Sequence, residues 1–179
     1  MTNPKTIPAL IGLSIALSLA AAEQPPTLNP HLEALRPLLG KTWKGELSGS
    51  TPEKPTIDVA RWERALNGQA VRLLHSINQG LYGGETLIIW NEKTQKVEYF
   101  YFTTAGYMTT GTMETKNGKI ETHEQVKGDA GGVTEVRGTS EILPAGKFHV
   151  KAEYLKDGQW TLGHEVTYQE DSASEVVFK

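Results

Sequence analysis

The stretch that decides the fold runs from Gly80 to Gly111 and reads GLYGGETLIIWNEKTQKVEYFYFTTAGYMTTG. Two runs rich in β-branched and aromatic residues, 85–91 and 96–104, flank a polar segment at 92–95. Such runs on either side of a polar turn predict an antiparallel β-hairpin. Both faces of each arm are apolar, whereas a half-solvated antiparallel sheet shows only one apolar face. We therefore expect one face to line an interior and the other to need a cover.

Alternate residues of a strand share a face, which sorts the hairpin side chains into two sets. The set expected to line the interior is Ile88, Trp90, Tyr99 and Tyr101. The set expected on the outside is Leu87, Ile89, Phe100 and Phe102. The pattern alone permits the two sets to be exchanged, but in either case an apolar outer face remains. The expected cover is the N-terminal helix or a partner chain.

Strand patterns separated by turn residues continue along the rest of the chain from residue 42. The predicted strands are 42–49, 56–66, 69–78, 85–91, 96–104, 107–115, 119–127, 134–143, 147–155 and 159–170. Asn67-Gly68 and Asn117-Gly118 are typical two-residue hairpin turns. Consecutive strands joined by tight turns pair with their neighbours, so we predict an all-β, antiparallel, up-and-down barrel of about ten strands over 42–179. A two-sheet sandwich is the alternative, but its crossings need longer connections.

One short helix is expected within residues 23–41, after a Pro-rich linker. Asn29 is a good N-cap and Pro30 suits the first helical position. Apolar residues recur at helical spacing, namely Leu32, Leu35, Leu38 and Leu39. Pro37 should kink or split the helix. We expect this helix to plug one end of the barrel or to lie against its outer wall.

Residues 1–22 have the pattern of a secretory signal. A short basic start precedes an apolar run at 7–19 and a small-residue site at 20–22. The run is shorter than the roughly 20 apolar residues of a spanning helix, so cleavage is favoured over an uncleaved anchor. The chain has no cysteine to carry a lipid. The expected product is periplasmic or secreted, without a stable membrane anchor.

Composition excludes some classes of partner. The chain has 179 residues, a formal charge of −3 and 38% hydrophobic residues, which fits one ordinary globular domain. No basic stripe is present that would indicate a nucleic-acid partner. There is no phosphate-binding loop, nucleophile elbow or histidine pair at metal-binding spacing. The carboxylates Glu63, Glu85, Glu98 and Glu165 stand apart, so no acid and base pair is predicted and we expect a non-catalytic protein.

Strand alternation also separates the histidines. His75 shares a face with Val71, Leu73 and Ile77, whereas His123 and His149 alternate with charged residues. His164 shares a face with Trp160, Leu162, Val166 and Tyr168. The interior aromatic residues either line a ligand pocket or fill the barrel, and a ten-stranded barrel favours a cavity. The candidate ligand-binding residues are His75, Trp90, Tyr99, Tyr101, Trp160, His164 and Tyr168.

Residues 38–45, LLGKTWKG, resemble the first-strand Gly-Trp-Gly signature of calycin barrels. Together with RWE at 61–63, LNG at 66–68, YGGE at 82–85 and DGQW at 157–160, they are similar to a bacterial family of exported, lipocalin-like calycin barrels. That family is distantly similar to nitrobindin, a haem-binding barrel. The resemblance implies that Trp43 seals the closed end. It also implies that His164, on a late strand, would be the axial ligand if haem is bound.

Three functions are therefore open at this point. The leading hypothesis is an exported barrel that binds a small, mainly apolar molecule in its lumen. The second is a nitrobindin-like haem protein that acts on reactive nitrogen or oxygen species through His164. The third is an envelope interaction protein that uses the outer apolar hairpin face, for example as a homodimer surface.

Overall fold

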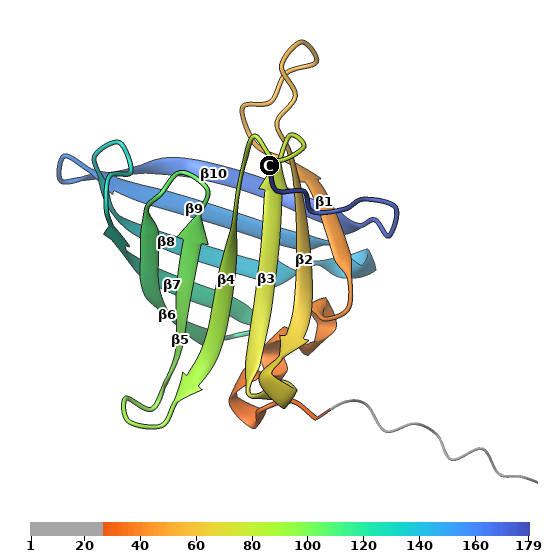
Figure 1. Ribbon diagram of the computed structural model, residues 1–179, viewed down its shortest axis with the longest axis vertical. Helices are drawn as coiled ribbons and strands as arrows, with labels where there is room; N and C mark the ends of the chain where they lie inside the picture. The colour runs from red at the N-terminus through yellow and green to blue at the C-terminus, as the bar shows by residue number, and fades with distance from the viewer. Residues whose placement is uncertain (1–26) are drawn as a thin grey trace, which may run out of the picture.

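The computed structural model describes residues 27–179, so the predicted signal sequence lies outside the described residues. Ten antiparallel strands form one closed barrel in which each strand pairs with the next and β1 pairs with β10 (Figure 1). The strands are β1 Thr42–Glu46, β2 Ile57–Ala65, β3 Ala70–Ile77, β4 Tyr82–Asn91, β5 Lys96–Thr103, β6 Met108–Lys116, β7 Lys119–Lys127, β8 Val133–Ile142, β9 Phe148–Lys156 and β10 Gln159–Glu170. The predicted all-β, up-and-down barrel with one short N-terminal helix is confirmed.

Short helical turns and hairpin turns connect these strands. Besides η1, Pro30–Leu38, the described residues form two single turns, η2 Leu66–Gly68 and η3 Pro144–Gly146. Asn117 and Gly118 join β6 to β7 with φ values of 52° and 77°. Positive φ at both central residues is the condition of a type I′ turn, whose twist matches that of the flanking strands.

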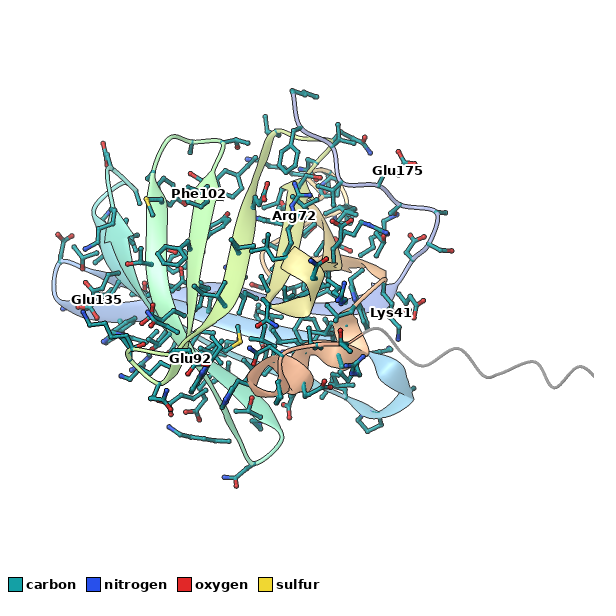
Figure 2. All side chains as sticks on the ribbon, turned by 60° about the horizontal axis from the view of Figure 1, so that its bottom comes forward. Lys41, Arg72, Glu92, Phe102, Glu135 and Glu175 are labelled. Carbon is teal, nitrogen blue, oxygen red and sulfur yellow. The ribbon has the colours of Figure 1, made fainter. Side chains whose placement is uncertain are left out.

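The N-terminal segment η1 is a 3₁₀ helix that lies across one end of the barrel (Figure 2). The side chain of Asn29 accepts a hydrogen bond from the backbone N–H of His31 at 3.0 Å, as expected of an N-cap. Leu32, Leu35 and Leu38 are buried in the same core as Trp43, whose indole N–H donates to the Leu38 carbonyl at 3.3 Å. The helix therefore plugs the barrel, one of the two expected positions.

The outer face of the hairpin is not covered by this helix. Leu87, Ile89 and Phe100 stay half-buried, and Phe102 is 51% exposed. The expectation that η1 covers this face was wrong, because its buried leucines, Leu32, Leu35 and Leu38, pack into the core at the barrel end. The C-terminal segment lies against the end of β3, where the backbone N–H of Val177 donates to the Ser76 hydroxyl at 3.0 Å.

A β-bulge in β10 changes the face of its first residues. Leu162 lies opposite Glu153 but His164 lies opposite Ala152, so Gly163 is the extra residue. A Cβ at Gly163 would come within 2.5 Å of the Tyr154 ring, so only glycine fits this close approach. The bulge turns Leu162, 54% exposed, to the outside while His164 faces the lumen.

Candidate functional site

The lumen contains two chambers that share part of their walls. The deep chamber, next to the plugged end, has a volume of about 240 Å³, and the outer chamber about 410 Å³. The outer chamber reaches the strand ends opposite η1, at Leu47, Ile77 and Val133. The apolar side chains of the deep chamber include Ala60, Trp62, Leu73, Ile88, Met113 and Phe148. These dimensions and this lining are those of a small-molecule site.

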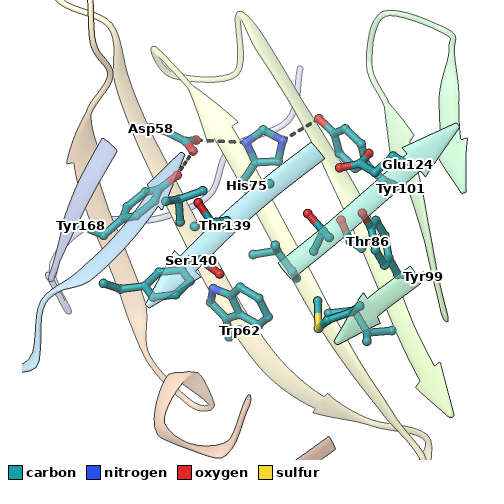
Figure 3. A pocket seen from close by; sticks show the side chains of 18 of the residues that line it. Asp58, Trp62, His75, Thr86, Tyr99, Tyr101, Glu124, Thr139, Ser140 and Tyr168 are labelled. Carbon is teal, nitrogen blue, oxygen red and sulfur yellow. Dashed lines mark hydrogen bonds and ion pairs between the residues drawn. The ribbon is translucent and has the colours of Figure 1, made fainter. Parts of the chain in front are cut away.

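A line of hydrogen bonds crosses the lumen wall from Asp58 to Tyr101 (Figure 3). Nδ1 of His75 lies 3.1 Å from Oδ1 of Asp58, and Nε2 of His75 lies 2.7 Å from the Tyr101 hydroxyl. The other carboxylate oxygen of Asp58 accepts a hydrogen bond from the buried Tyr168 hydroxyl. Both ring nitrogens of His75 therefore have a partner, which fixes the orientation of the ring.

The line continues to the outer chamber through two more tyrosines. The Tyr101 hydroxyl lies 2.9 Å from that of Tyr82, which lies 2.8 Å from that of Tyr107. Burial raises the pKa of Tyr82 and of Tyr101, so both hydroxyl groups keep their protons at neutral pH. Five of the six groups come from five different strands, and the sixth, Tyr107, directly precedes β6. Their donors can all point toward Asp58.

A second imidazole, His164, faces both chambers. Its Nδ1 lies 2.8 Å from the Tyr154 hydroxyl. Burial lowers the pKa of His164, so the ring is neutral at pH 7, and burial raises the pKa of Tyr154 to about 12. Among the described residues only Tyr154 forms a hydrogen bond with this ring, which leaves Nε2 for a ligand.

A carboxyl group on β7 completes the polar wall. Glu124 lies where the two chambers meet and accepts a hydrogen bond from the Thr109 hydroxyl. Burial raises the pKa of Glu124. Beside it, the Tyr99 ring is only 4% exposed, and its hydroxyl makes no hydrogen bond of ordinary geometry with the described residues.

Five of the seven candidate residues line the lumen as expected: His75, Tyr99, Tyr101, His164 and Tyr168. Trp90 instead lies at the plugged end, where its ring stacks on His31 with 3.5 Å between centroids. Trp160 is on the outside, 4.5 Å from the Arg137 guanidinium, because the bulge at Gly163 reverses the strand alternation. The expectation that Trp90 and Trp160 line the pocket was therefore wrong.

Sequence reasoning missed several lumen residues, and two of them carried a signal. On β7 the outward residues 119, 121, 123, 125 and 127 are all polar, so the opposite register is interior. That register holds Ile120 and Val126 and also Glu124, whose place inside could have been predicted. Tyr154 carried the same signal, because it shares a register of β9 with Phe148, Val150 and Ala152 while the opposite register is mostly charged. Asp58, Tyr82 and Tyr107 carried no comparable signal, because polar and apolar residues mix on both faces of their strands or occur near strand ends.

The described residues also set limits on other sites. Within 27–179, no group of three or more His, Asp or Glu side chains is arranged to hold a metal ion. No helix in this part of the chain is long and apolar enough to cross a membrane.

Comparison with known proteins supports the fold. No protein-family model matches the chain, and neither does any curated protein. The crystal structure of Rv2717c from M. tuberculosis is similar, with a TM-score of 0.60 and 16% sequence identity over 81% of this chain and 99% of that one. At this identity the likeness shows the barrel fold alone.

Proposed function

We propose that this protein is an exported barrel that binds a small, mainly apolar molecule in its lumen without catalysis. The observation that carries the proposal is the deep chamber, where apolar side chains meet a hydrogen-bonding wall formed by His75, Tyr101 and Glu124. Such a site takes a ligand with an apolar body and one polar head, since each part meets its complement. The pattern of residues 1–22 supports a periplasmic or secreted location, and the calycin-like motifs support a ligand-binding role.

Filling the deep chamber tests this proposal. Met113 lines that chamber, whereas its neighbour Thr112 faces outward opposite Glu98 and His123. Met113→Trp should abolish uptake of a neutral naphthylamine dye, whose fluorescence rises in apolar surroundings, while Thr112→Trp should leave it unchanged. Equal uptake by both variants would place the dye elsewhere and oppose lumenal binding. Mass spectrometry of molecules released from the natively purified protein would then identify the ligand.

A haem function is the second candidate, favoured by one observation. His164 is a neutral imidazole in the lumen, with Nδ1 bonded to Tyr154 and no hydrogen bond to Nε2 from the described residues. That is the arrangement of a histidine that ligates a metal. Bound haem would supply chemistry on reactive nitrogen or oxygen species, and His164 would be its axial ligand. Haemin titration tests this: no Soret shift, or the same shift in His164→Ala, would reject it.

An interaction role is the third candidate, favoured by the exposed ring of Phe102 beside Phe100 on the outer hairpin face. Contiguous exposed apolar residues mark interaction surfaces. A homodimer formed through this face should dissociate in Phe102→Ser. Light scattering that gives the same mass for both proteins would oppose it.

A further inference from the structure

The lumen has one carboxyl group whose hydrogen bonds are incomplete. Asp58 is satisfied on both oxygens, by His75 and by Tyr168. Glu124 receives a hydrogen bond on Oε2 from Thr109, and no described residue completes one of ordinary geometry with Oε1. Since Glu124 lines both chambers, its carboxyl group borders the space that a ligand would occupy.

A second polar group is directed at the same point. Tyr99 on β5 lies opposite Gly111 on β6, which lies opposite Glu124 on β7. A Cβ at Gly111 would come within 2.7 Å of the Tyr99 hydroxyl, so the absence of a side chain there lets the ring lie across toward Glu124. The Tyr99 hydroxyl is buried and lies near Glu124 and Thr122, but it makes no hydrogen bond of ordinary geometry within the described residues. A buried polar group without a partner is costly, so a ligand atom that satisfied both groups would be favoured.

The charges of the lumen select the chemistry of that atom. Among the described residues, the lining of the deep chamber includes no Lys or Arg, and that of the outer chamber includes only Lys151. Lys151 belongs to the outward register of β9, where its charge lowers the pKa of Glu153. An anionic head group would therefore find no Lys or Arg partner among the described lining of the deep chamber, which is unfavourable in an apolar lumen.

An ammonium group fits where an anion does not. It has three N–H donors, which match Oε1 of Glu124, the Tyr99 oxygen and the hydroxyl of Thr122, a residue on the same wall. The rings of Tyr99 and Tyr101 line the same chamber and favour a cation near their faces. Building on lumenal binding of an apolar molecule, we propose that the ligand is an amine with an apolar tail, and that Glu124 and Tyr99 bind its nitrogen as an ammonium ion.

The proton balance of this step is simple. Burial raises the pKa of Glu124, so the empty lumen favours the protonated carboxyl. When a neutral amine enters, the O–H bond of Glu124 breaks and an N–H bond forms, which leaves a carboxylate and an ammonium ion in contact. When the amine enters already protonated, Glu124 forms the ion pair as a carboxylate, and any proton that it held goes to water. Both routes reach the same ion pair.

Three ligands with the same ten-carbon tail test the proposal on the purified protein by titration calorimetry, below their micelle concentrations: decylamine, decanol and decanoate. Decylamine should bind about tenfold more tightly than decanol, and decanoate most weakly. Glu124→Gln should remove the advantage of the amine and leave decanol binding nearly unchanged. Glu121→Gln, on the outward register of the same strand, should behave as the parent protein.

The outcomes distinguish the amine proposal from the proposed lumenal binding on which it rests. Decanoate binding as tightly as decylamine, or an undiminished amine preference in Glu124→Gln, would overturn the amine assignment while lumenal binding stands. If none of the three ligands binds, both proposals fail. Tyr99→Phe provides a second variant that keeps the ring and removes only the hydroxyl, and it too should weaken decylamine more than decanol.

Discussion

Nε2 of His75 and the hydroxyl of Tyr101 lie 2.7 Å apart in a hydrogen bond, and this contact joins β3 to β5 across β4. It is the middle link between the Asp58 carboxylate and the tyrosines of the outer chamber. Because it connects strands that are not neighbours in the sheet, it restrains the shape of the lumen as well as the orientation of one side chain.

Removing this hydroxyl should destabilise the protein. Tyr101→Phe leaves Nε2 of His75 and the Tyr82 hydroxyl without their shared partner, at an expected cost of about 1 to 3 kcal/mol in the free energy of unfolding. Tyr107→Phe is the matched control, because the Tyr107 hydroxyl ends the line and among the described residues bonds only to the hydroxyl of Tyr82. Urea denaturation of both variants measures the difference. Equal losses in the free energy of unfolding would mean that the Tyr101 hydroxyl stabilises the protein no more than the Tyr107 hydroxyl does.

The bulge in β10 predicts a clash that a second substitution relieves. In Gly163→Ala the new Cβ would lie 2.5 Å from the Tyr154 ring, and such overpacking costs about 1 to 3 kcal/mol. In the double variant with Tyr154→Ala the ring is gone, so the added cost of Gly163→Ala should fall close to zero. A double-mutant cycle of unfolding free energies measures this coupling. Additive effects of the two substitutions would contradict the packing described for the bulge.

Glu124 should make stability fall with rising pH. Its folded pKa is raised above the usual 4.5, so between 4.5 and the folded pKa the native state holds more protons than the unfolded state. The free energy of unfolding therefore decreases as pH rises through this window, and above the folded pKa the full cost of a buried carboxylate remains. Glu124→Gln should raise the melting temperature at pH 8 and change it little at pH 4. A rise in melting temperature that is larger at pH 4 than at pH 8 would contradict the burial of Glu124.

The helix η1, which plugs the barrel end, should contribute much of the free energy of unfolding. Leu35 is 1% exposed among other apolar residues of the core, so Leu35→Ala should cost about 2 to 5 kcal/mol. Leu81 is 78% exposed, and Leu81→Ala should change the free energy of unfolding by less than about 0.5 kcal/mol. Chemical denaturation compares the two. A small loss in Leu35→Ala would mean that η1 is not an integral part of the core.

Local patterns predicted most of the barrel because strand alternation depends only on neighbouring residues. His75, Tyr99 and Tyr101 lie on the predicted face, and each predicted strand corresponds to one observed strand. Trp160 does not lie on the predicted face, because one extra residue at Gly163 reverses the alternation of β10. No local signal marks that position as a bulge rather than a turn. The helix could be recognised from its cap, but its place could not, since an apolar helix face fits a barrel end as well as an outer wall.

The amino-acid sequence by itself determined the number of strands, their antiparallel order and the apolar character of both hairpin faces, since propensity and alternation act over a few residues. Only the tertiary structure decided which polar groups meet in the lumen. Asp58, His75, Tyr101 and Glu124 come from four strands, and closure of the barrel in one register brings them to a common space. Pairing across the barrel depends on that closure, which no short stretch of sequence encodes.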